Sequence, residues 1–96
     1  MPQFLILAND YQDADALNRR MSVREEHLKR VRSDKPSGKF IIGGARLNEK
    51  QEMTGSMLVV EFPDEAAVHD WIKLDPYVTG KVWEEISITP FRVATV

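Results

Sequence analysis

Residues 3–8, with the sequence QFLILA, form a run in which both alternating faces are hydrophobic. Such a run is typical of a β-strand that is covered on both sides. Residues 40–42 and 57–60 share this property. A sheet built from these segments needs an apolar cover on each face, and this requirement limits the possible folds more than any other feature of the chain.

Extended and helical patterns alternate along the chain in the order βαββαβ. The predicted strands are residues 3–8, 39–47, 56–62 and 81–91, and the predicted helices are roughly 13–32 and 64–74. Asp64 is a suitable N-cap for the second helix, and Asp75-Pro76 ends it. This order predicts an α+β, ferredoxin-like fold, with a four-stranded antiparallel sheet and both helices on one face.

The two helices can cover only one face of this sheet. The other face would then expose more apolar surface than a soluble monomer usually shows, which is roughly a few hundred Å². We therefore expect a second copy of the chain to cover it, which predicts a homodimer. No repeat or linker interrupts the 96 residues, so residues 1–96 are predicted to form a single domain.

The composition excludes several classes of function. The formal net charge is −2 and both signs are mixed along the chain, which argues against nucleic acid as a partner. The absence of cysteine excludes disulfides, thiolate metal sites and cysteine nucleophiles, and makes the cytoplasm the default location. The N-terminal apolar run is too short for a signal peptide or membrane span, so no membrane association is expected.

The first predicted helix carries charged residues on its apolar side. Its hydrophobic residues fall on one arc, which is predicted to be the buried stripe: Leu17, Met21, Leu28 and Val31. Arg24 projects into this arc and His27 lies at its edge. One interpretation is a pocket in which Arg24 holds an anion and His27 moves a proton. The alternative is that Arg24 pairs with a buried carboxylate or snorkels, and that His27 is a half-buried structural histidine.

Asp75 is a second candidate because the following proline restricts its backbone. A carboxylate held in this way could orient a histidine, although Asp-Pro-Tyr could equally be a plain helix stop. His69 falls on the polar side of the second helix, and we expect it at the surface. The two histidines lie on separate helices, so no metal site is predicted. Gly43-Gly44 inside a predicted strand indicates a bulge or a space for a ligand.

Several motifs occur together in one order: RxxH in the first helix, GG in the second strand, TGS before the third, then DPYV and a closing ITPF. This assembly resembles the YciI-like (YCII-related) family of small dimeric α+β barrel proteins. The resemblance implies a sheet packed against its twin, a small-molecule pocket in each subunit, and a catalytic pair formed by His27 and Asp75. By position it also places Arg24, Gly44 and Ser56 in the pocket, and we count Tyr77 among the substrate-binding candidates.

These observations lead to three hypotheses of function. The first is a metal-free and cofactor-free enzyme in which His27, oriented by Asp75, removes a proton from a small aromatic or carboxylate substrate anchored by Arg24. Lyase chemistry, such as the halide elimination linked to some relatives, or isomerase chemistry fits this arrangement. The second is a non-catalytic module that binds a small ligand. The third is an oxygenase, either cofactor-independent or with haem on His27, against which the adjacent Arg24 argues. We also expect the polar connection 48–55 to lie near the pocket mouth.

Overall fold

The computed structural model describes all 96 residues and contains four strands and three helices. They are β1 (Gln3–Asp10), α1 (Ala16–Asp34), β2 (Phe40–Leu47), β3 (Met53–Glu61), α2 (Glu65–Ile72), α3 (Pro76–Thr79) and β4 (Trp83–Phe91). The strands form one antiparallel sheet in the order β2-β3-β1-β4. The predicted ferredoxin-like arrangement is confirmed, and the single-turn helix α3 is an element that the sequence reading missed.

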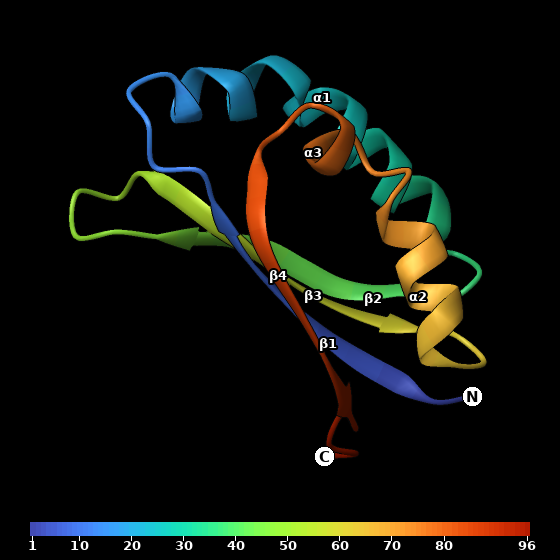
Figure 1. The fold of residues 1–96 in the computed structure, drawn as a ribbon. Helices are drawn as coiled ribbons and strands as arrows, with labels where there is room; N and C mark the ends of the chain where they lie inside the picture. Colours follow the sequence, from blue (N-terminus) through green and yellow to red (C-terminus); the bar gives the residue numbers. More distant parts are fainter.

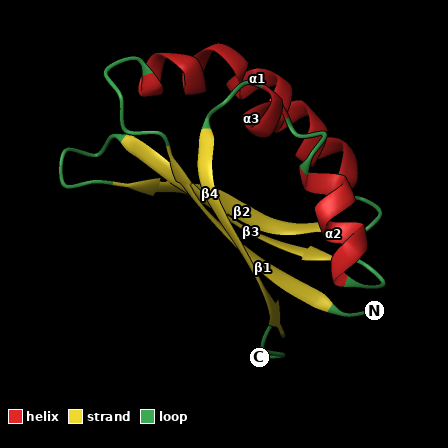
Figure 2. Ribbon diagram, in the orientation of Figure 1, coloured by secondary structure: helices red, strands yellow, loops and turns green.

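The molecule has two layers, a twisted sheet and a layer of helices (Figure 1). All three helices lie on the same side of the sheet, with α3 tucked beneath α1, and no helix covers the opposite side (Figure 2). None of the helices combines the length and the apolar character needed to span a membrane. The functional residues of this fold must therefore be sought in the space between the helices and the sheet, or on the bare face.

The core lies between the two layers. Phe4, Ile6 and Ala8 alternate along β1 and are buried against the helices. The other core members come mainly from β3, the two short helices and the start of β4: Val31, Leu58, Val60, Phe62, Val68, Trp71, Ile72, Tyr77, Val82 and Trp83. Burial of this apolar surface is the main force that holds the helices on the sheet, at about 25 cal/mol per Å².

The helix-free face is also apolar, as the two-sided strand pattern predicts. Leu5 pairs with Val59 and Leu7 pairs with Met57 across β1 and β3. Ile42 of β2 extends this surface beside Val59 and is 56% exposed. Val59 is itself buried among its neighbours, but no helix covers this face, and Leu7 and Ile42 leave apolar surface exposed on it.

The buried face of α1 differs from the predicted stripe. Leu17 and Met21 are 37% and 51% exposed, whereas Arg20, His27 and Val31 are buried. The prediction holds for Val31 and was wrong for Leu17 and Met21, because the hydrophobic periodicity was taken to mark the whole inner face. Carboxylate partners elsewhere in the chain allow Arg20 and His27 to occupy that face instead.

The glycines of the sheet generate a prediction about stability. A Cβ atom added at Gly55 would lie 2.4 Å from the carbonyl oxygen of Ala8, inside the central β1–β3 ladder. The strands would have to separate, so Gly55→Ala should lower the free energy of unfolding by about 1–3 kcal/mol. The matched control is Gly44→Ala on β2, where a Cβ atom meets nothing within 4 Å. Urea denaturation should separate the two variants, and equal stability would contradict the described register.

Candidate active site

A cavity of about 190 Å³ lies between α1 and the sheet. Its walls come from α1, α3 and the facing strands β2 and β3: Arg20, Arg24, His27, Leu28, Val31, Phe40, Gly43, Gly44, Ala45, Ser56, Met57, Leu58 and Tyr77. All ionisable side chains of this wall come from the helices, because the strand residues that line it are apolar, glycine or serine. The chemistry of the cavity is therefore determined by α1 and α3.

Asp75 joins these two helices through its carboxylate. Its Oδ1 accepts the backbone N–H of Tyr77 at 2.9 Å and so caps α3, whose first residue is Pro76. The same oxygen lies 2.8 Å from Nδ1 of His27. Oδ2 accepts a hydrogen bond from Arg30 at 3.1 Å. The distance between His27 and Asp75 is the one expected for a histidine and its orienting carboxylate, and the motif is more than a helix stop.

The hydrogen bonds of Asp75 determine which nitrogen of His27 is free. The Asp75 carboxylate accepts hydrogen bonds from Tyr77 N–H and from Arg30, and a carboxylate oxygen can only accept from His27 as well. Nδ1 of His27 therefore carries the proton, and the lone pair of the neutral ring is on Nε2. Nε2 has no hydrogen-bond partner within the protein, and the ring lines the cavity. The arrangement presents an unoccupied base to any molecule that enters.

Aromatic side chains hold the His27 ring in place. Tyr77 stacks on it with ring centroids 4.0 Å apart and planes 16° apart. Trp83 meets the same ring edge-on at 5.9 Å. The Tyr77 hydroxyl is buried without a partner, and burial raises the pKa of Tyr77 above its ordinary value although Arg20 and Arg24 oppose the shift. Tyr77 therefore stays a neutral phenol, and its clearest contribution to the site is the packing of His27.

Arg24 is half-buried and lines the same cavity. It forms no hydrogen bond or ion pair with any carboxylate of the chain, in contrast to Arg20 and Arg30. The alternative in which Arg24 pairs with a buried carboxylate is therefore wrong. An unpaired guanidinium beside a cavity is a ready partner for an anionic ligand.

A second buried network, around Arg20, was not predicted from the sequence. The Nη1 atom of Arg20 donates to both oxygens of Asp10, at 3.0 and 2.9 Å. Its Nη2 donates to Oγ of Ser56 at 2.9 Å, and Nε1 of Trp83 donates to the same hydroxyl at 3.1 Å. Burial raises the pKa of Asp10 above its ordinary value, while the Arg20 hydrogen bond lowers it in part. The spacing of Arg20 and His27 by seven residues, two helical turns, was the available signal.

The remaining candidates lie as follows. Ser56 is in the wall of the cavity but its hydroxyl is engaged by Arg20 and Trp83. Gly44 also lines the cavity, yet it pairs with Met57 and so faces the helix-free side, whereas Gly43 pairs with Leu58 and faces the helices. A Cβ at Gly43 would lie 3.0 Å from the Phe40 ring. The bulges of β2 fall at Phe40/Ile42 and Arg46/Leu47 and not at the glycine pair.

Two further expectations concern the periphery. The connection 48–55 does not line this cavity, so the prediction that it lies at the pocket mouth is wrong; its Asn48 instead closes the hairpin turn by accepting from the backbone of Lys50 and Glu52. His69 is exposed beside Glu65, as predicted. The structure contains no cluster of three or more His, Asp or Glu side chains suited to a metal ion.

The fold and the cavity together define a small ferredoxin-like α+β protein with a buried histidine–carboxylate pair between helix and sheet. The chain belongs to the YCII-related domain family, whose model matches residues 3–92. It is 33% identical over 95 residues to Protein YciI of Escherichia coli O6:H1, covering 93% of this chain and 95% of that protein.

Two solved structures show the fold. One is 5-chloro-2-hydroxyhydroquinone dehydrochlorinase (TftG) from Burkholderia phenoliruptrix AC1100, in complex with 2,5-dihydroxybenzoquinone. It has a TM-score of 0.81 at 24% identity and covers 96% of this chain and 95% of its own. The other is a dimeric ferredoxin-like protein of unknown function from Jannaschia sp. CCS1, with a TM-score of 0.50 at 12% identity, covering 97% of this chain and 100% of its own. The family resemblance read from the sequence is confirmed.

The buried Arg20–Asp10 pair predicts a strongly non-additive effect on stability. Arg20→Met leaves the Asp10 carboxylate buried alone and should cost about 3–5 kcal/mol of unfolding free energy. Combining it with Asp10→Leu removes both charges and should recover most of that loss. The control is Arg19→Met, because Arg19 makes a similar two-pronged pair with Asp13 at the surface and should cost at most about 1 kcal/mol. Urea unfolding measures all three, and an additive double variant would contradict the coupling.

Proposed function

We propose that this protein is a cofactor-independent acid/base enzyme, of the lyase or isomerase type, that acts on a small anionic substrate. The observation that carries the proposal is the buried 2.8 Å hydrogen bond between His27 and Asp75 at the wall of a cavity. This bond leaves Nε2 of His27 free as a general base. The dehydrochlorinase that shares the fold supports elimination as the type of reaction.

The charges and size of the cavity support a small anion as substrate. Arg24 contributes a cation that no protein carboxylate neutralises, and the lining contains no Asp or Glu. The volume of about 190 Å³ is close to that of an apolar cavity of roughly 150 Å³ known to hold one benzene ring. One ring, or a short carboxylate, fits such a space. Haem would need a much larger pocket, which argues against the oxygenase hypothesis with haem.

In the proposed reaction the anionic group of the substrate pairs with Arg24, which places the adjacent C–H bond at His27. Nε2 takes the proton, and the resulting imidazolium is stabilised by the ionised Asp75 through Nδ1–H. For an isomerase, the same nitrogen returns the proton to another carbon. For a lyase, the electron pair of the broken C–H bond forms a double bond while the leaving group departs with its own electron pair. Neither route needs an oxidant.

This proposal predicts the effects of three substitutions on turnover. His27→Gln should lose about 10²–10⁴-fold in kcat, because the base is absent. Asp75→Asn should also lower kcat, and the double variant should lose little more than the worse single one, since the pair acts as a unit. Arg24→Met should mainly weaken substrate binding. The assay is turnover of a panel of small hydroxylated aromatics, chlorinated analogues and carboxylates.

The control variant for this panel is His69→Gln, which changes an exposed histidine and should keep full activity. Thermal-shift measurements with the same compounds separate catalysis from binding. One outcome would contradict the proposal of an enzyme: a compound stabilises the wild-type protein but not Arg24→Met, and neither protein turns it over. That result would favour the alternative, a non-catalytic binding module. Full activity of His27→Gln would also contradict the proposal.

We further propose that the active assembly is a homodimer joined through the helix-free faces of two sheets. The patch around Leu7 and Ile42 is apolar, and no helix of the chain covers it. A structurally similar protein is described as dimeric. A second copy matches the patch in chemistry, since the same apolar face is then buried on both sides.

The dimer proposal makes a prediction for solution. Leu7→Arg places a charge in the middle of the helix-free face and should convert the dimer to a monomer at micromolar concentration. Leu74→Arg is the control, because Leu74 is the same residue type and is also exposed, but it lies beyond α2, on the helix side. Light scattering measures the mass of each. A monomeric wild-type protein would refute the interface, and so would a Leu7→Arg variant that remains dimeric.

A further inference from the structure

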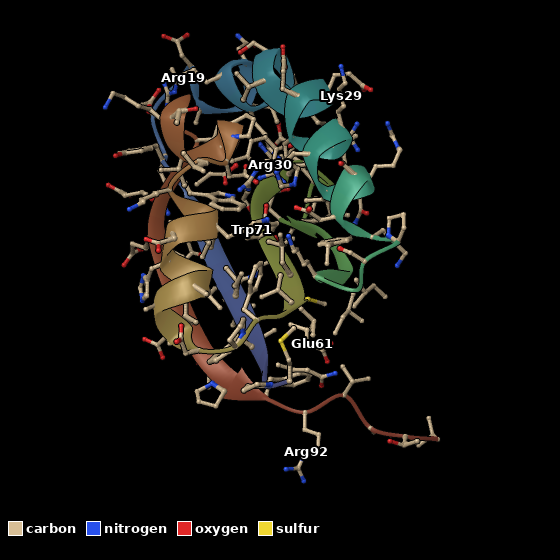
Figure 3. All side chains as sticks on the ribbon, turned by 90° about the vertical axis from the view of Figure 1, so that its right-hand side faces the viewer. Arg19, Lys29, Arg30, Glu61, Trp71 and Arg92 are labelled. Carbon is tan, nitrogen blue, oxygen red and sulfur yellow. The ribbon has the colours of Figure 1, made fainter.

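Asp75 has an oxygen that His27 does not use. Oδ2 accepts a hydrogen bond from Nη1 of Arg30 at 3.1 Å, while Nη2 of the same guanidinium donates to the carbonyl oxygen of Trp71. The guanidinium carbon also lies 4.5 Å from the centroid of the Trp71 ring. Figure 3 shows Arg30 and Trp71 close together between α1 and α2. One arginine thus spans the carboxylate and the helix that precedes it.

We propose that Arg30 is a positioning residue that fixes the Asp75 carboxylate in the orientation that His27 requires. Both other donors, His27 Nδ1 and Tyr77 N–H, bind Oδ1, so without Arg30 nothing in the protein would hold Oδ2. A buried carboxylate oxygen with no donor is strongly unfavourable. The carboxylate would therefore turn toward water, and the hydrogen bond to His27 would open more often.

Trp71, which Arg30 contacts, is also held by a second residue of α1. Asp34, one helical turn further on, accepts a hydrogen bond from the indole N–H of Trp71 at 2.8 Å. Arg30 therefore binds Trp71 at its backbone carbonyl, and Asp34 binds it at its indole nitrogen. Because Asp75 follows Trp71 by four residues, these two hydrogen bonds fix the end of α2 just before Asp75.

The exposed fractions of Asp75 and Arg30 show that Arg30 contacts the carboxylate from its solvent side and not from the cavity. The Asp75 side chain is completely buried, whereas the Arg30 side chain is 21% exposed in a groove that Glu26, Ser33 and Leu74 also line. The Arg30 side chain therefore lies between the Asp75 carboxylate and the solvent. It does not line the cavity, so its effect on the reaction passes through Asp75. The catalytic meaning of this role rests on the proposed function, but the positioning itself does not.

The test is the imidazole signal of His27 in nitrogen-15 NMR spectra of the ligand-free protein. In the wild type, the neutral ring should carry its proton on Nδ1 alone, and this proton should exchange slowly with water. In Arg30→Met the exchange should become faster by about tenfold or more, with a detectable share of the other tautomer. Arg30→Lys keeps the charge but lacks the fork, so it should show the same changes to a smaller extent. Arg32→Met, an exposed arginine on the same helix, should match the wild type.

The proposal would be overturned if the His27 Nδ1 proton exchanged at the wild-type rate, and the ring kept the wild-type tautomer, in both Arg30→Met and Arg30→Lys. Arg30 would then be only a surface cation. If Arg30→Met does not fold, the Lys variant decides by the same criterion. The measurement needs no substrate, so its outcome is separate from that of the turnover panel. A general loss of stability would speed exchange across the backbone amides as well, whereas a positioning role speeds exchange at the His27 ring while amides in the β1–β3 ladder stay protected.

Discussion

The structure depends on one fully buried carboxylate, that of Asp75. An isolated ionised carboxylate is very costly to bury, and it is tolerated only with several donors. Asp75 has three, from Tyr77 on α3 and from His27 and Arg30 on α1. These bonds attach α3 to the inner face of α1, and they set the orientation of the His27 ring above the sheet. The geometry of the cavity wall therefore follows from the three hydrogen bonds to the Asp75 carboxylate.

The two faces of the sheet have different roles because their neighbours differ. On the helix side, Arg20, Arg24 and His27 replace part of the apolar layer, and carboxylates from β1 and from the start of α3 pair with Arg20 and His27 but not with Arg24. The excess positive charge faces the cavity and favours an anion there. The other face keeps apolar side chains on which no helix of this chain packs, and the homodimer proposed above would bury them.

The sequence predicted the topology because hydrophobic alternation, the Asp64 cap and the proline after Asp75 are local signals. It also placed His27 and Asp75 together through a family resemblance. It failed where side chains from distant segments meet. Arg20 was missed because its partner Asp10 is recognised only once β1 and α1 are packed, and Leu17 was wrongly placed inside for the same reason. Arg30 gave no signal either, since an arginine near the end of a helix is most often at the surface.

The proposed function requires that an anion in the cavity reaches the free nitrogen of His27. A crystal structure of the protein soaked with a small hydroxylated aromatic anion, such as a dihydroxybenzoquinone, tests this claim most directly. We expect the anionic oxygen to lie on Arg24 and the ring to lie within hydrogen-bond reach, roughly 2.6–3.2 Å, of His27 Nε2. An empty cavity, or an anion bound only at other arginines on the surface, would contradict it.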